Sequence, residues 1–180
     1  TAVPLPEYAP TRRIIKGEKL TIIVLGSIIN TVLPAVLNLK KNVVDLWLIS
    51  EFPLNIPKEL FDSIKKTRMV CVVEEHVSIG GLGHHLNHIL VENRISFKHF
   101  IHLYAKGYIS HRHGSRDFYL KESGLDKESI KKVIEDLILK TKQYGEKEIK
   151  RVFGEIGQKN IDNPKRNYVY VTRILGKIPE

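Results

Sequence analysis

The residues best suited to chemistry lie together in residues 72–83, where two acids and a histidine precede a glycine-rich turn. Carboxylate and imidazole groups can transfer protons, and the free N–H groups at the start of a helix can bind an anion. Apolar residues at helical spacing follow the turn, so a helix is expected to begin there. We predict that an interface or an anion-binding site is formed by Glu74, Glu75, Gly80, Gly81, Gly83 and His84.

The glycine-rich turn does not match a dinucleotide-binding fingerprint, which needs Gly-x-Gly-x-x-Gly directly after a strand. His84, His85 and Leu86 follow Gly81 and Gly83, so the third glycine is missing. Several residues also separate the turn from the preceding apolar run. We therefore reject a nucleotide-cofactor site at this turn.

The eight histidines of the chain raise the question of a metal site, but their spacing argues against one. His84 and His88 are four residues apart, which places two side chains on one face of a helix. The zinc-protease pattern needs a glutamate after the first histidine, and His85 occupies that position. We expect these histidines to lie near a surface or a subunit contact, and we predict no bound metal.

The chain contains no clear catalytic constellation. The weak catalytic candidates are His76, at the end of an apolar run, and His113, in a polar loop, and a structural role is favoured for both. The one cysteine, Cys71, lies inside an apolar run, where thiols are usually inert. The serines lack the Gly-x-Ser-x-Gly elbow of a nucleophilic triad.

Short apolar runs alternate with helical patterns along residues 20–140. The predicted strands cover residues 20–25, 43–49, 69–73 and 97–103, and the predicted helices cover residues 27–39, 56–66, a segment after 80–83, 116–123 and 127–140. Ser27 is expected to cap the first helix, which Pro34 would kink. Such alternation implies a mostly parallel sheet covered on both faces, which is an α/β fold.

We divide the chain into a proline-rich linker at residues 1–19, a domain at 20–140 and a basic extension at 141–180. Residues 140–180 contain ten Lys and Arg but five Asp and Glu, so much of the net charge of +9 lies there. Residues 168–175 alternate like a strand. A basic binding module for nucleic acid or an acidic partner is an alternative function, but the extension lacks aromatic-interleaved motifs, and a solvated extension is favoured over a nucleic-acid contact.

Composition narrows the class of protein. No apolar run approaches the roughly 20 residues that span a bilayer, so we expect no membrane contact. A single cysteine cannot form an internal disulfide, which fits a reducing compartment, and we expect a cytoplasmic location. The chain does not begin with methionine, so we expect it to be trimmed from a longer protein.

Four motifs in order resemble the C-terminal domain of the transketolase family. They are the strand before Gly26, the Val43-to-Ile49 run followed by Glu51-Phe52-Pro53-Leu54, the Glu74-to-Gly83 segment, and His113-Gly114-Ser115-Arg116-Asp117 with Gly124-Leu125-Asp126. Similar domains occur in transketolase, in 1-deoxyxylulose-5-phosphate synthase and in the beta subunit of 2-oxo-acid dehydrogenases. The resemblance covers residues 20–139 and implies a three-layer α/β/α sandwich around a mostly parallel sheet of about five strands.

The resemblance also implies a division of labour. In this family two other domains bind thiamine diphosphate and magnesium across a dimer, and two-carbon transfer depends on that coenzyme. We therefore expect this chain to bind no cofactor, to supply packing and dimer contacts, and to be inactive in isolation. Its expected partners are the catalytic domains or subunit of the same enzyme and a second copy of itself. A regulatory domain that binds an anion at the glycine turn is a further alternative.

Overall fold

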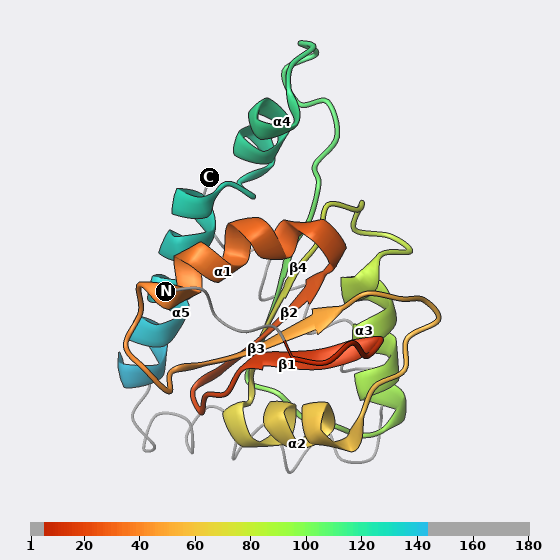
Figure 1. The fold of residues 1–180 in the computed structure, drawn as a ribbon, viewed down its shortest axis with the longest axis vertical. Coiled ribbons are helices and arrows are strands. Elements are labelled where there is room, and N and C mark those ends of the chain that lie inside the picture. Colours follow the sequence, from red (N-terminus) through yellow and green to blue (C-terminus); the bar gives the residue numbers. More distant parts are fainter. Residues whose placement is uncertain (1–5, 144–180) are drawn as a thin grey trace, which may run out of the picture. The chain divides into compact units, whose positions relative to one another are not determined.

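The computed structural model describes residues 6–143, and it contains a five-stranded sheet with helices on both faces (Figure 1). The strands are β1 (Thr11–Ile15), β2 (Leu20–Leu25), β3 (Val44–Ile49), β4 (Met69–Val73) and β5 (His99–Leu103), in the spatial order β1-β3-β2-β4-β5. Strands β2 to β5 run parallel, and β1 pairs antiparallel with β3. The predicted α/β sandwich with a mostly parallel sheet is confirmed.

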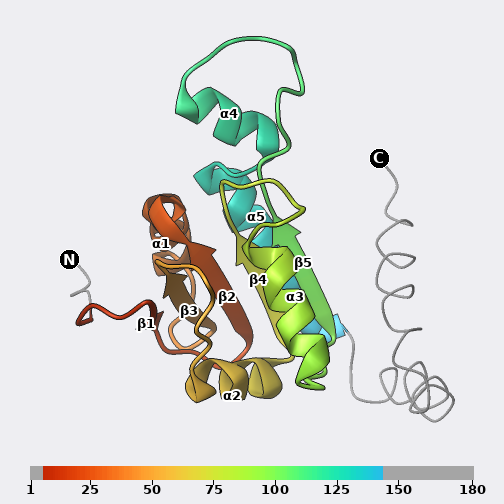
Figure 2. The same ribbon diagram turned by 90° about the vertical axis from the view of Figure 1, so that its right-hand side faces the viewer.

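Two hydrophobic cores hold the helices against the sheet. A 3-10 turn, η1 (Gly26–Ile28), leads into α1 (Ile29–Leu37), which packs with α5 (Lys127–Gln143) on one face. On the other face lie α2 (Lys58–Thr67) and α3 (Leu82–Glu92), while α4 (Arg116–Ser123) precedes α5 (Figure 2). The chain divides into two compact units, Thr1–Ile138 and Leu139–Glu180, and the sheet belongs to the first.

The sequence patterns explain why these elements form. Every residue of β4 is buried and apolar, as a central strand covered on both faces requires. In α3 the residues Leu82, Leu86 and Leu90 recur at helical spacing and are fully buried against the sheet. Gly124 ends α4 in a left-handed conformation that glycine adopts without strain.

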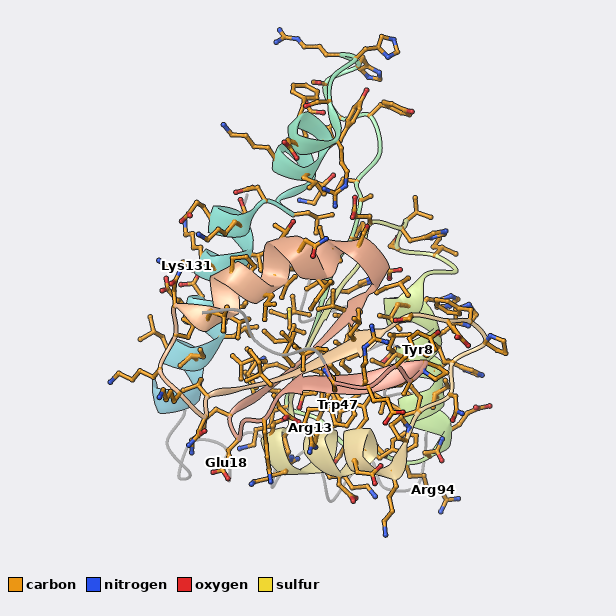
Figure 3. The ribbon with its side chains drawn as sticks, viewed as in Figure 1. Tyr8, Arg13, Glu18, Trp47, Arg94 and Lys131 are labelled. Carbon is orange, nitrogen blue, oxygen red and sulfur yellow. The ribbon has the colours of Figure 1, made fainter. Side chains whose placement is uncertain are left out.

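Strand β1 lies within the stretch that we assigned to a linker, where we expected no strand. Two long-range contacts support this edge strand. The Arg13 guanidinium lies 4.5 Å from the Trp47 ring centre, and its Nε lies 3.2 Å from Asp45 Oδ1 (Figure 3). Asp45 is itself buried and accepts hydrogen bonds from Trp47 Nε1 at 2.8 Å and from the Gly17 N–H at 3.1 Å. The Arg13 side chain therefore contacts a carboxylate and an aromatic ring that are both distant from it in the sequence.

The expected capping role of Ser27 is wrong. Helix α1 begins after Ile28 and has no side-chain cap. The Ser27 hydroxyl instead donates a hydrogen bond to Glu75 Oε1 at 3.2 Å. Because Gly26 and Ser27 belong to a 3-10 turn, the serine faces the end of β4 rather than the α-helical N–H groups.

Residues 141–143 of the predicted basic extension belong to helix α5, while the rest of the extension and the strand predicted at residues 168–175 lie outside the described residues and stay predictions. None of the helices in residues 6–143 is long and apolar enough to cross a membrane.

Candidate functional site

The polar residues of the Glu74–His84 segment lie at one edge of the sheet, where the parallel strands β2 to β5 end. We call this the carboxyl edge. Three connections form it: residues 50–57 after β3, residues 74–81 after β4 and residues 104–115 after β5. In open α/β sheets, ligands and partners usually meet this edge.

Glu74 is fully buried directly after β4, and its carboxylate caps the start of α3. Its carboxylate accepts the N–H groups of Leu82 at 2.7 Å and Gly83 at 2.9 Å, and it lies 2.5 Å from His102 Nε2. Burial alone would raise the pKa of Glu74, but the hydrogen bonds with His102, Gly83 and Leu82 outweigh burial and leave the pKa below its usual range. Glu74 therefore stays ionised as an internal anion at the start of the helix.

Two glycines allow this carboxylate to approach the helix so closely. A Cβ atom on Gly83 would lie 2.5 Å from the His102 ring, and one on Gly81 would overlap the Glu74 carboxyl group. Two of the predicted glycines, Gly81 and Gly83, therefore do lie against the predicted acid Glu74, but their contact is part of the packing of the fold. The N–H groups that we expected to bind an external anion are already bound by Glu74, so this geometry disfavours the anion-binding alternative.

Glu75 connects the end of β4 with Ser27, which follows β2, and with Arg116, which begins α4. Its carboxylate receives two hydrogen bonds from Arg116, from Nε at 2.8 Å and from Nη2 at 2.5 Å. The Ser27 hydroxyl donates a third. The pair is partly exposed, with 29% of the Glu75 side chain and 51% of the Arg116 side chain accessible. Glu75 therefore orients α4 against the end of β4.

The predicted histidines are scattered over the surface of this region. His76 is exposed, and its carbonyl accepts the Ala105 N–H, which ties residues 74–81 to the segment after β5. His84 Nδ1 accepts the Gly80 N–H at 3.1 Å, and His88 pairs with Glu92 one helical turn away. None of these side chains contacts Glu74 or Glu75 among the described residues.

His113 lies in the exposed segment between β5 and α4, far in sequence from the glutamates. The base of this segment is fixed by Tyr119, whose hydroxyl accepts the Gly114 N–H and donates to the Arg112 carbonyl. Ser115 caps α4 by accepting the Phe118 N–H. A catalytic role for His76 or His113 stays a prediction.

Sequence reasoning did not single out His102 or Arg116 as partners of the acids. His102 carries one weak signal, since it and His99 are the two polar residues of a short strand whose other residues are apolar. Arg116 carries none, because its partner lies 41 residues away. Only the register of β4 and β5, in which Val72 pairs with His102, brings the imidazole to Glu74.

Several large apolar side chains are exposed on the same three connections. Val77 is 51% exposed and Ile79 is 79% exposed after β4, while Tyr108 and Ile109 are 67% and 51% exposed after β5. Phe52, on the connection after β3, is 46% exposed and packs edge-on against His85. We call these five residues, which lie on the three connections of the carboxyl edge, the apolar rim.

The described residues do not fit a diphosphate–magnesium group. No group of three or more potential metal-ligating side chains occurs in residues 6–143. The one glycine-rich helix start is bonded to the ionised Glu74, whose charge would repel a diphosphate. Burial raises the pKa of the Cys71 thiol to about 12, so this cysteine is not a ready nucleophile.

The comparisons with known proteins agree on one family. Residues 9–130 match the family described as transketolase, C-terminal domain. Matching curated relatives include the 1-deoxy-D-xylulose-5-phosphate synthase of Clostridium perfringens strain 13, which is 30% identical over 135 residues, covering 73% of this chain and 22% of the relative. The synthase of Alcanivorax borkumensis is 28% identical over 144 residues, covering 76% and 20%. The chain thus spans about a fifth of the length of these relatives.

A solved structure shares the fold. It is described as a split gene transketolase in an inactive beta4 tetramer, and it aligns with a TM-score of 0.59 at 22% identity. The alignment covers 75% of this chain and 47% of that chain.

Proposed function

The chain belongs to the transketolase C-terminal domain family, and from this premise we propose that it is the C-terminal domain, or a split subunit, of a thiamine-diphosphate-dependent transketolase-type enzyme. In this proposal it packs against the catalytic part of that enzyme and contributes to a homodimer. It does not hold the coenzyme, and it is inactive alone.

The observation that carries the proposal is the apolar rim. Its five exposed side chains lie on three connections at one edge of the sheet, and their exposure is costly unless another surface covers them. Two of the connections, residues 74–81 and 104–115, are tied together by the Ala105–His76 backbone hydrogen bond, and the Glu75–Arg116 pair holds the first of them to α4. A rigid apolar surface loses little conformational entropy when a partner binds.

The two acids support a scaffolding role over a catalytic one. Glu74 is buried and bound to a helix start, and Glu75 is paired with Arg116. A general acid or base must reach the proton it transfers, and neither carboxylate is free to do so. The relatives that are synthases, and the neighbour that forms a tetramer, are both consistent with a domain that works as part of an assembly.

A reconstitution experiment tests the proposal. Calorimetry with thiamine diphosphate and Mg²⁺ should show no saturable binding to the isolated chain, and ketose phosphate assays should show no turnover. Adding the coenzyme-binding domains of the same enzyme should produce an active complex whose rate depends on this chain. Coenzyme binding or turnover by the isolated chain would refute the proposed division of labour.

The homodimer is tested separately by sedimentation equilibrium of the full 180-residue chain. A monomer–dimer equilibrium that shifts to monomer in Val77→Asp supports the dimer contact. A chain that stays monomeric at high concentration contradicts this part of the proposal and leaves the contact with the catalytic domains to be judged on its own.

A further inference from the structure

A pocket of about 370 Å³ lies beside the Glu75–Arg116 pair, between α4 and the segment that leaves β5. Small-molecule pockets have volumes of roughly 300–1,000 Å³, so this pocket is near the lower end. Both views of the ribbon place α4 next to that segment (Figures 1 and 2). Nothing in the proposed scaffolding role requires a pocket here.

The floor of the pocket is apolar and its wall is aromatic. Leu125 is fully buried, Leu120 is 7% exposed, and both line the pocket. Tyr108 and Tyr119 form the wall, with ring centres 5.5 Å apart and planes at 89°. The Tyr119 ring is held in place by its two hydroxyl hydrogen bonds, whereas the Tyr108 hydroxyl has no partner among the described residues. A flat ring fits such a surface because aromatic pairs favour offset and edge-on contacts.

Arg116 lines the pocket and supplies a cationic hydrogen-bond donor of fixed orientation. Its Nε and Nη2 atoms bond Glu75, which fixes the plane of the guanidinium. A guanidinium carries five N–H donors, so Nη1 keeps donors that no described residue accepts. Planar guanidinium groups recognise carboxylates with directed hydrogen bonds.

Charged groups of both signs lie at the mouth of the pocket. Glu75 is the one carboxylate that lines the pocket, Arg116 pairs with it, and the charge of Asp117 also acts on Arg116. The segment from residue 104 to residue 115 carries Lys106 and Arg112 and contains no acid. A carboxylate on the free Nη1 edge of Arg116 would accept directed hydrogen bonds there, and Lys106 and Arg112 on the adjoining segment oppose a cationic ligand.

We infer that this pocket binds a small aromatic monocarboxylate, with its ring on Leu120 and Leu125 against Tyr119 and its carboxylate on the free edge of Arg116. The site uses residues of this chain alone. It shares Tyr108 with the apolar rim, so it is tested on the isolated chain, in which no catalytic domain covers that side chain.

The test is an NMR titration of the ¹⁵N-labelled full chain with benzoate. Saturable shifts are expected at the amides of Gly107, Tyr108 and Ser123, with a Kd on the order of 1 mM, which suits a ligand of this size. Acetate lacks the ring, benzamide lacks the charge, and inorganic phosphate lacks both the ring and the planar carboxylate. All three should bind at least tenfold more weakly.

Two variants assign the binding to the proposed groups. Arg116→Gln should weaken benzoate binding at least tenfold, and its partly exposed ion pair makes loss of the fold a small concern. Tyr108→Ala, at a side chain without described hydrogen bonds, should weaken it severalfold with the spectrum otherwise preserved. Lys65→Gln, which lies on α2 away from this pocket, is the matched control and should bind as the wild type does.

Three outcomes would overturn the inference. These are the absence of saturable shifts with benzoate, equal binding of acetate or phosphate, and benzoate binding that Arg116→Gln leaves unchanged.

Discussion

At the scale of single residues, the sequence and the structure suggest different roles for Glu74. In the sequence it belongs to an acid-rich motif, which suggests proton transfer. In the fold it is a buried anion that satisfies two backbone N–H groups of α3 and one imidazole. Because Glu74 is fully buried, we expect substitutions of it to change the stability of the fold.

Stability should fall in acid partly through Glu74. Its folded pKa is lower than its unfolded value of about 4.3. Its contribution is therefore present above the unfolded pKa and is lost as pH falls through the folded pKa. Denaturant unfolding between pH 6 and pH 2 should show a decline that is shallower in Glu74→Gln. The same variant should lose about 2 kcal/mol at pH 6, since an amide leaves a buried N–H group unpaired. Equal pH slopes in the two proteins would contradict this role.

Gly83 should resist substitution although it lies in a helix. Alanine normally stabilises a helix interior relative to glycine by roughly 1 kcal/mol. Here the added Cβ would meet the His102 ring at 2.5 Å. Overpacking costs about 1–3 kcal/mol, so we expect Gly83→Ala to lower the free energy of unfolding.

A double variant separates this clash from other effects of the substitution. Adding His102→Ala removes the ring that the new methyl group meets, so the second substitution should cost less in the Gly83→Ala background than alone. Additive losses would show that the contact between Gly83 and His102 is not the cause.

At the scale of elements, the strands and helices with strong local signals were predicted from the sequence. The buried run of β4, the leucine stripe of α3 and the glycine that ends α4 each act within a few residues. Strand β1 was missed because three of its five residues are arginine or threonine. It forms because Asp45 and Trp47 of β3 receive Arg13, and such a contact has no local signature.

The candidate site was predicted in the same uneven way. The acids and glycines were named from their motif, and the structure brings Glu74, Gly81 and Gly83 into contact. Their partners His102 and Arg116 were not named, because strand register and helix placement decide which side chains meet. The segment was predicted as an interface or an anion-binding site; Glu74 bonds the helix start that an external anion would need, and the interface stays a prediction.

Helix α5 offers a test of local capping. Asp126 Oδ1 accepts the N–H groups of Glu128 and Ser129, each at 3.1 Å, and Oδ2 accepts the Ser129 hydroxyl. Replacing an N-cap residue by alanine costs about 1 kcal/mol. We expect that loss in Asp126→Ala by thermal or urea unfolding. Asp126→Asn keeps the cap and should stay within about 0.5 kcal/mol of the wild type. Equal losses in both variants would argue that the charge matters rather than the cap.

At the scale of the whole molecule, the described fold has a buried core on each face of the sheet and an apolar rim at its carboxyl edge. The two cores stabilise the fold, and the apolar rim is the surface that we propose a partner domain covers. The chain belongs to the transketolase C-terminal domain family and spans about a fifth of the length of the curated relatives that it matches, and on these findings rests the proposal that it is one domain of a larger enzyme.

The most direct test measures the affinity of this chain for the coenzyme-binding part of the same enzyme. Ile79→Asp should raise the Kd at least tenfold, because a central interface position commonly contributes more than about 1.4 kcal/mol. Leu37→Asp, at an exposed leucine on α1 away from the apolar rim, is the control and should leave the Kd unchanged. Wild-type affinity in Ile79→Asp, or an equal loss in both variants, would contradict docking through the apolar rim.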